Sequence, residues 1–375
     1  MIYLDNAATT LRKPPQVALS MARAVANCAS PGRGVHAPAM RAADVVYSCR
    51  EAAGKLFHFP APEKAVFTMN ATHGLNIAVR TLVRPGMITL ISGYEHNAVV
   101  RPLKAIGTNM EIFRGDGFST DSLLEDFQRK LPGADAVVCT HVSNVFGFRL
   151  PVETMSDLCR EYGVPMILDA AQSAGHFPID FAQLNVRFMA MPGHKGLLGP
   201  QGTGLLLCAE TAEPVLYGGT GNLSESEEMP EDLPERVEAG TQNVCGIAGL
   251  REGIHFVLQT GPDRIEEKER TLTEQLYEGL GRISGLQLIR VPAAARNGVV
   301  SVIPENMSCE DMAAALGRAG VAVRSGLHCA PLAHRTAGTI ATGTVRYSVS
   351  FFNTPEEIEK AIQITKTIIK NSYKM

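Results

Sequence analysis

The feature that most constrains the fold is an alternation of helix-like segments with short apolar runs between about Gln16 and Leu207. The runs have the length and the apolar character of buried strands: Ala65–Thr68, Met87–Ile91, Ala136–Thr140, Pro165–Leu168 and Gly204–Leu207. Because such alternation is typical of helices covering both faces of a mostly parallel sheet, the sequence predicts an α/β fold. Ligands of these sheets bind at the carboxyl ends of the strands, so the residues that follow each run are the first functional candidates.

A second domain is expected after a polar, loop-like stretch at residues 218–243. Helical patterns resume at residues 246–259 and 263–280. Short strands are then expected at 286–289, 299–302, 321–324 and 345–348, and helices at 309–319 and 355–369. We therefore predict a large ligand-binding domain over residues 16–250 and a small α+β domain formed by residues 1–15 and 251–375.

Charge and cysteine usage narrow the class of protein. The 375 residues carry a net charge of −3 with no basic run, which argues against nucleic acid or a membrane surface as partners. The N-terminus does not have the pattern of an export signal, and no apolar run reaches membrane-spanning length, so a cytoplasmic protein is expected. The 8 cysteines are scattered and form no CxxC pair, which favours reduced thiols over disulfides. We predict small-molecule chemistry and no metal site.

Two residues beyond strand ends suggest a pyridoxal-phosphate (PLP) site. Asp169 ends the run Pro165–Leu168, and Lys195 lies in the glycine-dense stretch 191–204. PLP needs an aspartate on its pyridine nitrogen and a lysine amine for its aldehyde. Taken singly, Asp169 could be a helix N-cap, and Lys195 could belong to a surface or a phosphate-binding loop, although the Walker pattern is not met. The pair together favours PLP.

Two further segments supply what this cofactor requires. After the strand Ala65–Thr68, small polar residues open a helix at Ala71 and Thr72, whose first N–H groups could face a phosphate. A plain helix cap would give the same local structure. His96 follows the strand Met87–Ile91 at the same sheet edge, where its ring could cover the cofactor.

With these motifs the chain resembles the cysteine desulfurases of the class V aminotransferase group, which have the PLP-dependent transferase fold of type I. The similarity extends from residues 3–10 to Tyr347, nearly the whole length. It includes the stretches Thr140–Gly147 and Glu238–Asn243 as well as Asp169, Gln172, His194 and Lys195.

The resemblance implies a role for each matching residue. Lys195 would carry the PLP aldehyde as a Schiff base, Asp169 would pair with the pyridine nitrogen, Gln172 would bond the ring oxygen, and His96 would stack on the ring. The phosphate would be held by Ala71, Thr72 and His194, with Thr241 contributed by the other subunit of a homodimer. The substrate side would be formed by Asn144, which also lies beside the cofactor, with Arg346, Arg324, His328, Arg33 and His36.

The segment Val323–Pro331 resembles the short cysteine loop of the second desulfurase subgroup. Cys329 would attack the sulfur of bound L-cysteine, forming a persulfide and releasing alanine before a sulfur-acceptor protein takes the sulfur. His328 or Arg324 could favour the thiolate by lowering its pKa. The alternative for Cys329 is a buried structural cysteine.

The sequence departs from the family pattern at two places, and three other functions stay open. Pro192 stands where the family has a phosphate-binding hydroxyl, a loss of about 0.5–1.5 kcal/mol that PLP binding should survive. Residues 334–339 resemble a less-studied desulfurase-like branch, which leaves the acceptor open. The alternatives are a selenocysteine lyase acting on L-selenocysteine, an aminotransferase or β-lyase that does not use Cys329, and a PLP-fold regulator.

Overall fold

The computed structural model describes residues 1–32, 34–221 and 225–373. Within this part of the chain the largest sheet has seven strands. In spatial order they are β2 (Ala65–Thr68), β8 (Gly204–Cys208), β7 (Phe188–Pro192), β6 (Met166–Asp169), β5 (Ala136–Thr140), β3 (Ile88–Ser92) and β4 (Asn109–Phe113). Only the pairings of β8 with β7 and β2 are antiparallel. The predicted mostly parallel sheet is confirmed.

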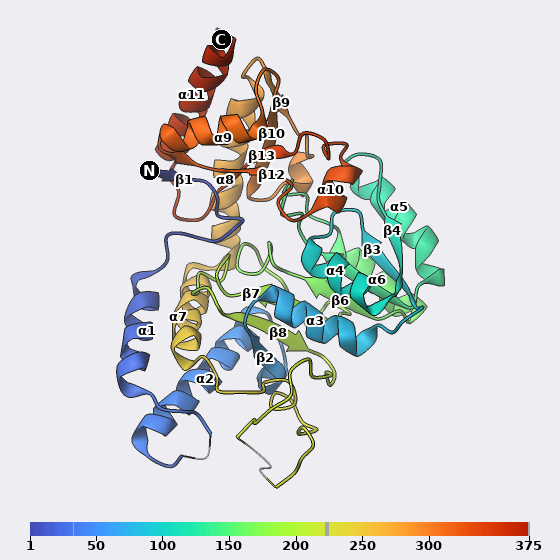
Figure 1. Ribbon diagram of the computed structural model, residues 1–375, viewed down its shortest axis with the longest axis vertical. Helices are drawn as coiled ribbons and strands as arrows, with labels where there is room; N and C mark the ends of the chain where they lie inside the picture. Colours follow the sequence, from blue (N-terminus) through green and yellow to red (C-terminus); the bar gives the residue numbers. More distant parts are fainter. Residues whose placement is uncertain (33, 222–224, 374–375) are drawn as a thin grey trace.

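The helices lie around this sheet and around a second group of strands (Figure 1). They are α1 (Pro15–Asn27), α2 (Ala37–Leu56), α3 (Ala71–Leu82), α4 (Asn97–Ile106), α5 (Thr120–Lys130), α6 (Val152–Tyr162), α7 (Val244–Thr260), α8 (Pro262–Gly281), α9 (Cys309–Arg318), α10 (Pro331–Thr336) and α11 (Pro355–Ser372). None of the described helices is long and apolar enough to cross a membrane.

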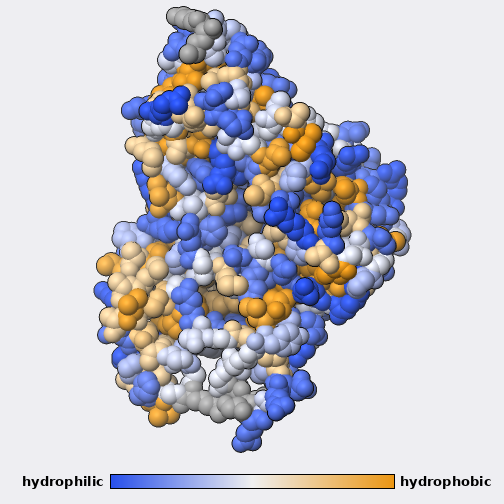
Figure 2. All heavy atoms as spheres, in the orientation of Figure 1, coloured by the Kyte–Doolittle hydropathy of each residue, from blue (hydrophilic) through white to orange (hydrophobic). Residues whose placement is uncertain are grey.

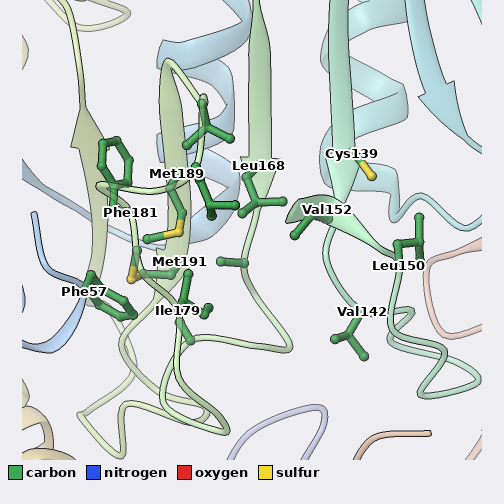
Figure 3. Packing of buried hydrophobic residues seen from close by; sticks show 14 of the residues in the cluster. Phe57, Cys139, Val142, Leu150, Val152, Leu168, Ile179, Phe181, Met189 and Met191 are labelled. Carbon is green, nitrogen blue, oxygen red and sulfur yellow. The ribbon is translucent and has the colours of Figure 1, made fainter. Parts of the chain in front are cut away.

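Side-chain alternation along the central strands builds a core on each face of the sheet. On β6, Leu168 packs into a cluster with residues of α2, α5, α6 and α7, whereas Ile167 packs into a cluster with residues of α3 and α4. The neighbouring β7 alternates in the same way, with Met189 on the side of Leu168 (Figure 3). Successive residues of a strand point to opposite faces, so a strand covered on both sides is apolar throughout. This gives the predicted layers.

A separate core lies around the C-terminal strands. The antiparallel sheet consists of β12 (Arg324–Gly326), β13 (Thr344–Ser348), β10 (Val299–Pro304) and β9 (Leu286–Leu288), and β1 (Ile2–Tyr3) pairs with β11 (Val321–Ala322). Ile2 and Leu4 pack there with α9 and α11. Helix α8 joins the two cores, since Ile265 belongs to the first and Leu276 to the second. The division of the chain at residue 250 stays a prediction.

The structure corrects some expected boundaries. The predicted strand 321–324 is two strands, β11 and β12, which belong to different sheets. The sequence analysis also missed β4 and β7. Strand β4 is an edge strand whose residues are largely exposed, and β7 (sequence FMAMP) contains no β-branched residue. Both lack the buried β-branched pattern that identified the other strands.

Candidate active site

Asp169 and Lys195 lie together because their strands are neighbours. Asp169 is the last residue of β6, and Lys195 follows β7, which runs parallel to β6. Their side chains line a cavity of about 200 Å³ at the carboxyl ends of these strands. The other residues that line it are Ala8, Asn70, Ala71, Thr72, His96, Ala98, Thr140, Asn144, Ala171, Gln172, Pro192 and His194. The cavity thus brings together residues that are far apart in the sequence.

The charges of the pair depend on burial. Burial lowers the pKa of Lys195 to about 8, Asp169 opposes that shift, and Arg346 adds to it. Burial also raises the pKa of Asp169, although the carboxylate accepts a hydrogen bond from the N–H of Ala171 at 2.9 Å. A lysine that loses its proton more easily is a better nucleophile toward an aldehyde.

His96 presents an uncharged ring to the cavity. It is the N-cap of α4, where its Nδ1 accepts a hydrogen bond from the N–H of Ala98 at 3.0 Å. Burial, followed by the charges of Lys195, Arg101 and Arg346, lowers the pKa of His96 to about 4. Its neutral, fixed imidazole can stack on an aromatic ligand.

The cavity is also lined by groups suited to a phosphate. Ala71 and Thr72 form the first turn of α3, whose N-cap Asn70 accepts a hydrogen bond from the N–H of His73 at 3.0 Å. The start of a helix favours anions through its N–H groups and its dipole. His194 also lines the cavity, with Nδ1 held 3.1 Å from the Thr9 hydroxyl. Burial lowers the pKa of His194 to about 4, so it is a neutral partner.

Arg346 and Asn144 form a buried polar pair beside this cavity. Arg346 donates from NH1 to the carbonyl of Asn144 at 2.9 Å and from NH2 to Oδ1 of Asp5 at 2.9 Å. Its buried Nε has no hydrogen-bond partner among the described residues, nor does Oδ1 of Asn144. Buried polar atoms are normally paired, so these two atoms indicate a site for a polar ligand.

The Cys329 loop is fastened to the same residues. The amide nitrogen of Asn144 donates to the carbonyl of His328 at 2.8 Å, and the N–H of Asn97, next to His96, donates to the carbonyl of Cys329 at 2.8 Å. Cys329 is exposed, so the structural alternative of a buried cysteine is wrong. An exposed thiol therefore lies on a loop tied to the cavity wall.

Of the two side chains expected to place a positive charge beside Cys329, Arg324 and His328, the second is uncharged. Burial, with a further contribution from Arg346, lowers the pKa of His328 to about 3, so this ring is neutral near pH 7. Arg324 forms an ion pair with Oδ2 of Asp5 at 3.1 Å. A neutral His328 ring offers no positive charge to the loop, and a role of His328 or Arg324 in favouring the thiolate stays a prediction.

Several candidate residues lie elsewhere. His36 is exposed at the N-cap of α2 and does not line the cavity, and Arg33 lies outside the described residues. Thr241 is exposed and lines a separate cavity of about 210 Å³. Gln172 does line the main cavity, with its amide nitrogen bonded to the carbonyl of Ala7 at 2.9 Å. Neither Thr241 nor His36 lines the cavity that contains Lys195.

The sequence analysis missed two acidic residues. Asp5 bridges Arg346 and Arg324, and Glu95 accepts a hydrogen bond from the N–H of Thr140 at 2.9 Å. Burial raises the pKa of Glu95 to about 8. Asp5 lies in the matching stretch of residues 3–10, and Glu95 lies directly before His96, but neither position indicates the partners of these carboxylates.

The residues fit PLP. A buried carboxylate, a lysine with a lowered pKa, a neutral stacking imidazole and a helix N-terminus all line one cavity, and an unpaired Asn144 oxygen lies in its wall. These are the groups that hold the ring nitrogen, aldehyde, ring face and phosphate of this cofactor. Pro192 also lines the cavity, so the expected hydroxyl is absent there. Fold and site together define a PLP-dependent enzyme with the type I fold.

Comparisons with known proteins identify the family. The Aminotransferase class-V family matches residues 2–361. A probable cysteine desulfurase of Methanothermobacter thermautotrophicus is 33% identical over 372 residues, covering 96% of this chain and 92% of that protein. Another probable cysteine desulfurase, of Pyrococcus abyssi, is 32% identical, and the match covers 99% of this chain and 95% of that protein. The chain therefore belongs to the class V aminotransferase family, whose members depend on PLP.

Solved structures agree with this assignment. The apo structure of a cysteine desulfurase from Thermococcus onnurineus superposes with a TM-score of 0.90 at 32% identity, covering 99% of this chain and 95% of that one. A cysteine desulfurase from Escherichia coli has a TM-score of 0.85 at 24% identity, covering 99% and 95%, and shows the shared fold. The predicted fold class and the resemblance stated from the motifs are confirmed.

Proposed function

We propose that this protein is a PLP-dependent cysteine desulfurase that converts L-cysteine to L-alanine and keeps the sulfur as a persulfide on Cys329. The observation that carries the proposal is an exposed cysteine whose backbone carbonyl is bonded to Asn97, the residue that follows His96 of the PLP cavity. An aminotransferase or β-lyase on this fold would need Lys195 but not a thiol at this position. The relatives named above support the same reaction.

PLP, when bound, withdraws electrons from the substrate's α-carbon and so weakens the bond between Cβ and Sγ. Asp169 would hold the ring nitrogen in its protonated form, and His96 would cover the ring face. Lys195 would hold the cofactor between turnovers and, once released, would take the α-proton on Nζ. Its lowered pKa, about 8, suits a group that must give and take a proton near neutral pH.

Cys329 performs the sulfur transfer in this proposal. Its thiolate attacks Sγ of the substrate, an S–S bond forms as the Cβ–Sγ bond breaks, and the electron pair of the broken bond stays with the carbon fragment. Protonation of that fragment gives alanine, so one cysteine and one thiol yield one alanine and one persulfide. Arg346 and Asn144 would hold the substrate carboxylate, with the unpaired Nε of Arg346 as a donor.

A selenocysteine lyase is the second candidate, because cleavage of a C–Se bond depends less on attack by an enzyme thiol. The test is to supply L-cysteine and L-selenocysteine separately to the PLP-loaded protein and measure alanine. We expect wild type to use cysteine, Cys329→Ser to lose that activity, and Cys245→Ser, a control at a partly exposed cysteine of α7, to keep it. Alanine formation from cysteine that survives Cys329→Ser would contradict the proposal, and a wild type that forms alanine from selenocysteine but not from cysteine would favour the lyase.

A homodimer is also part of the proposal, with Thr241 reaching the phosphate of the partner. Thr241 is exposed and does not line the Lys195 cavity of its own chain. Exposed apolar side chains on α1 and α2, including Leu19, Val25 and Tyr47, offer a surface for a second copy, and apolar residues are visible along that edge in Figure 2.

We further propose a reducing, cytoplasmic location, since all the cysteines are free.

A further inference from the structure

Two residues of the cysteine loop have a backbone conformation that side chains disfavour. His328 has φ of 50° and Cys329 has φ of 55°, both in the left-handed region. Residues other than glycine rarely adopt it, and two in succession must be held by their surroundings. The contacts of this loop therefore determine where the Cys329 thiol lies.

The backbone anchors account for part of this restraint. The carbonyls of Leu327, His328 and Cys329 accept hydrogen bonds from Ala330 N–H, the Asn144 side chain and Asn97 N–H, at 2.9, 2.8 and 2.8 Å. These bonds fix the carbonyl groups. They do not hold the His328 side chain, which points into the protein and is 8% exposed.

The His328 ring ends a chain of buried polar groups. Its Nε2 lies 3.3 Å from the carbonyl of Arg324, and its Nδ1 lies 3.5 Å from Nε2 of His334. The ring centroids are 5.7 Å apart with planes 13° from parallel. On the far side, Nδ1 of His334 lies 2.7 Å from the hydroxyl of Thr339. The chain thus extends from Thr339 to the strand that leads into the loop.

Hydrogen-bond chemistry gives this chain one direction. A carbonyl only accepts, so Nε2 of His328 carries the hydrogen that it donates to Arg324. Burial keeps both rings neutral, lowering the pKa of His328 to about 3 and that of His334 to about 4. Nδ1 of His328 is then an acceptor for Nε2–H of His334. With His334 in that tautomer, its Nδ1 accepts from the Thr339 hydroxyl.

We propose that this Thr339–His334–His328 chain positions Cys329, with Thr339 and His334 acting as positioning residues for the sulfur transfer proposed above. His334, on α10, is fully buried and contacts the ring of Phe146 with centroids 5.6 Å apart. The chain sets the tautomer and the orientation of the His328 ring. That ring fixes the backbone from Arg324 to Cys329, on which the thiol depends.

Thr339 allows a clean test, because its backbone bonds do not involve the hydroxyl. Its N–H donates to the carbonyl of His334 at 2.8 Å, and its carbonyl accepts from Gly343 N–H at 2.9 Å. Thr339→Val keeps the shape and these bonds but removes the hydroxyl, whereas Thr339→Ser keeps the hydroxyl. Thr342→Val makes the same chemical change at an exposed residue nearby that is not part of the Thr339–His334–His328 series of hydrogen bonds.

The experiment measures hydrogen exchange of residues 324–331 in the PLP-loaded protein, and the rate of persulfide formation on Cys329 by peptide mass spectrometry after one turnover with L-cysteine. We expect Thr339→Val to exchange faster in that segment and to form persulfide roughly fivefold more slowly. KM for cysteine should change little, because the groups that hold the substrate carboxylate are retained. Thr339→Ser and Thr342→Val should resemble wild type.

Two results would overturn the proposal. One is wild-type exchange and persulfide formation in Thr339→Val. The other is a Thr339→Ser variant as impaired as Thr339→Val, since the hydroxyl would then be irrelevant and only packing would matter. If wild type forms no alanine from cysteine, the proposed function fails, while the ranking of exchange rates still tests the hydrogen-bond chain.

Discussion

The places of Lys195 and Asp169 in the sequence were enough to predict that they form one site. Each stands beyond a recognisable strand, and parallel strands bring their ends to one edge, so the pair could be predicted from the sequence. Asp5 could not, because its partners Arg324 and Arg346 lie more than 300 residues away and meet it only through tertiary packing. The neutrality of His328 likewise depends on burial that no local motif reveals.

The lowered pKa of Lys195 leads to a pH prediction. The amine attacks the PLP aldehyde only when it is deprotonated, and a pKa of about 8 places that change below the ordinary value of 10.5. The rate at which apo-protein gains the visible absorbance of lysine-bound PLP should therefore rise with pH and level off above about 8. A rate that keeps rising toward pH 10.5 would mean that burial does not perturb this amine. Lys195→Arg is the control and should gain no such absorbance.

The ring of His96 should contribute to cofactor affinity by stacking rather than by charge. His96→Ala should weaken PLP binding roughly fivefold, in line with about 1 kcal/mol for an aromatic pair. His96→Phe should retain most of the affinity, because a neutral ring can replace a neutral ring. Equilibrium titration of the apo-proteins with PLP measures both. Equal losses in the two variants would assign the effect to the bond from Ala98 N–H instead.

At the scale of elements, strand prediction succeeded where the apolar pattern was local and continuous. The strand Ala136–Thr140 was predicted with its observed bounds, because it is buried on both faces and rich in β-branched residues. The split between β11 and β12 was not predictable, since one continuous run of residues passes from one sheet to another. Pairing partners, not local sequence, decide such a break.

Helix α11 provides a prediction at this scale. Its N-cap Thr354 accepts a hydrogen bond from Glu357 N–H and forms a capping box with that glutamate, which also pairs with Arg12 at 2.8 Å. Thr354→Ala should lower the free energy of unfolding by about 1 kcal/mol, and Thr354→Ser should be nearly neutral. Denaturant unfolding of the purified variants measures this. Identical midpoints for Thr354→Ala and wild type would show that the cap is dispensable.

At the scale of the whole molecule, the position of Thr241 makes the site of one chain incomplete under the dimer proposal. The sequence analysis gave Thr241 a role in the partner's site through resemblance alone. In the structure this residue is exposed and lines a different cavity from Lys195. The dimer proposal would reconcile the two by placing Thr241 of a second subunit at this site.

Mixing two variants with different defects tests the shared site. Lys195→Ala lacks the lysine, and Thr241→Ala should bind PLP weakly. A mixed dimer contains one site with an intact Lys195 from one chain and an intact Thr241 from the other, so co-refolding should restore tight PLP binding to up to one site per mixed dimer. Lack of any recovery in a mixture shown to contain mixed dimers would contradict a site built from two chains.

The most direct test of the central claim is the mass of the Cys329 peptide after one turnover. When PLP-loaded protein is mixed with L-cysteine and quenched by alkylation, the account predicts one additional sulfur atom on Cys329 and one alanine for each sulfur gained. Cys245 should gain none. Alanine produced in full with no added sulfur on Cys329 would contradict the assignment of this residue as the sulfur carrier.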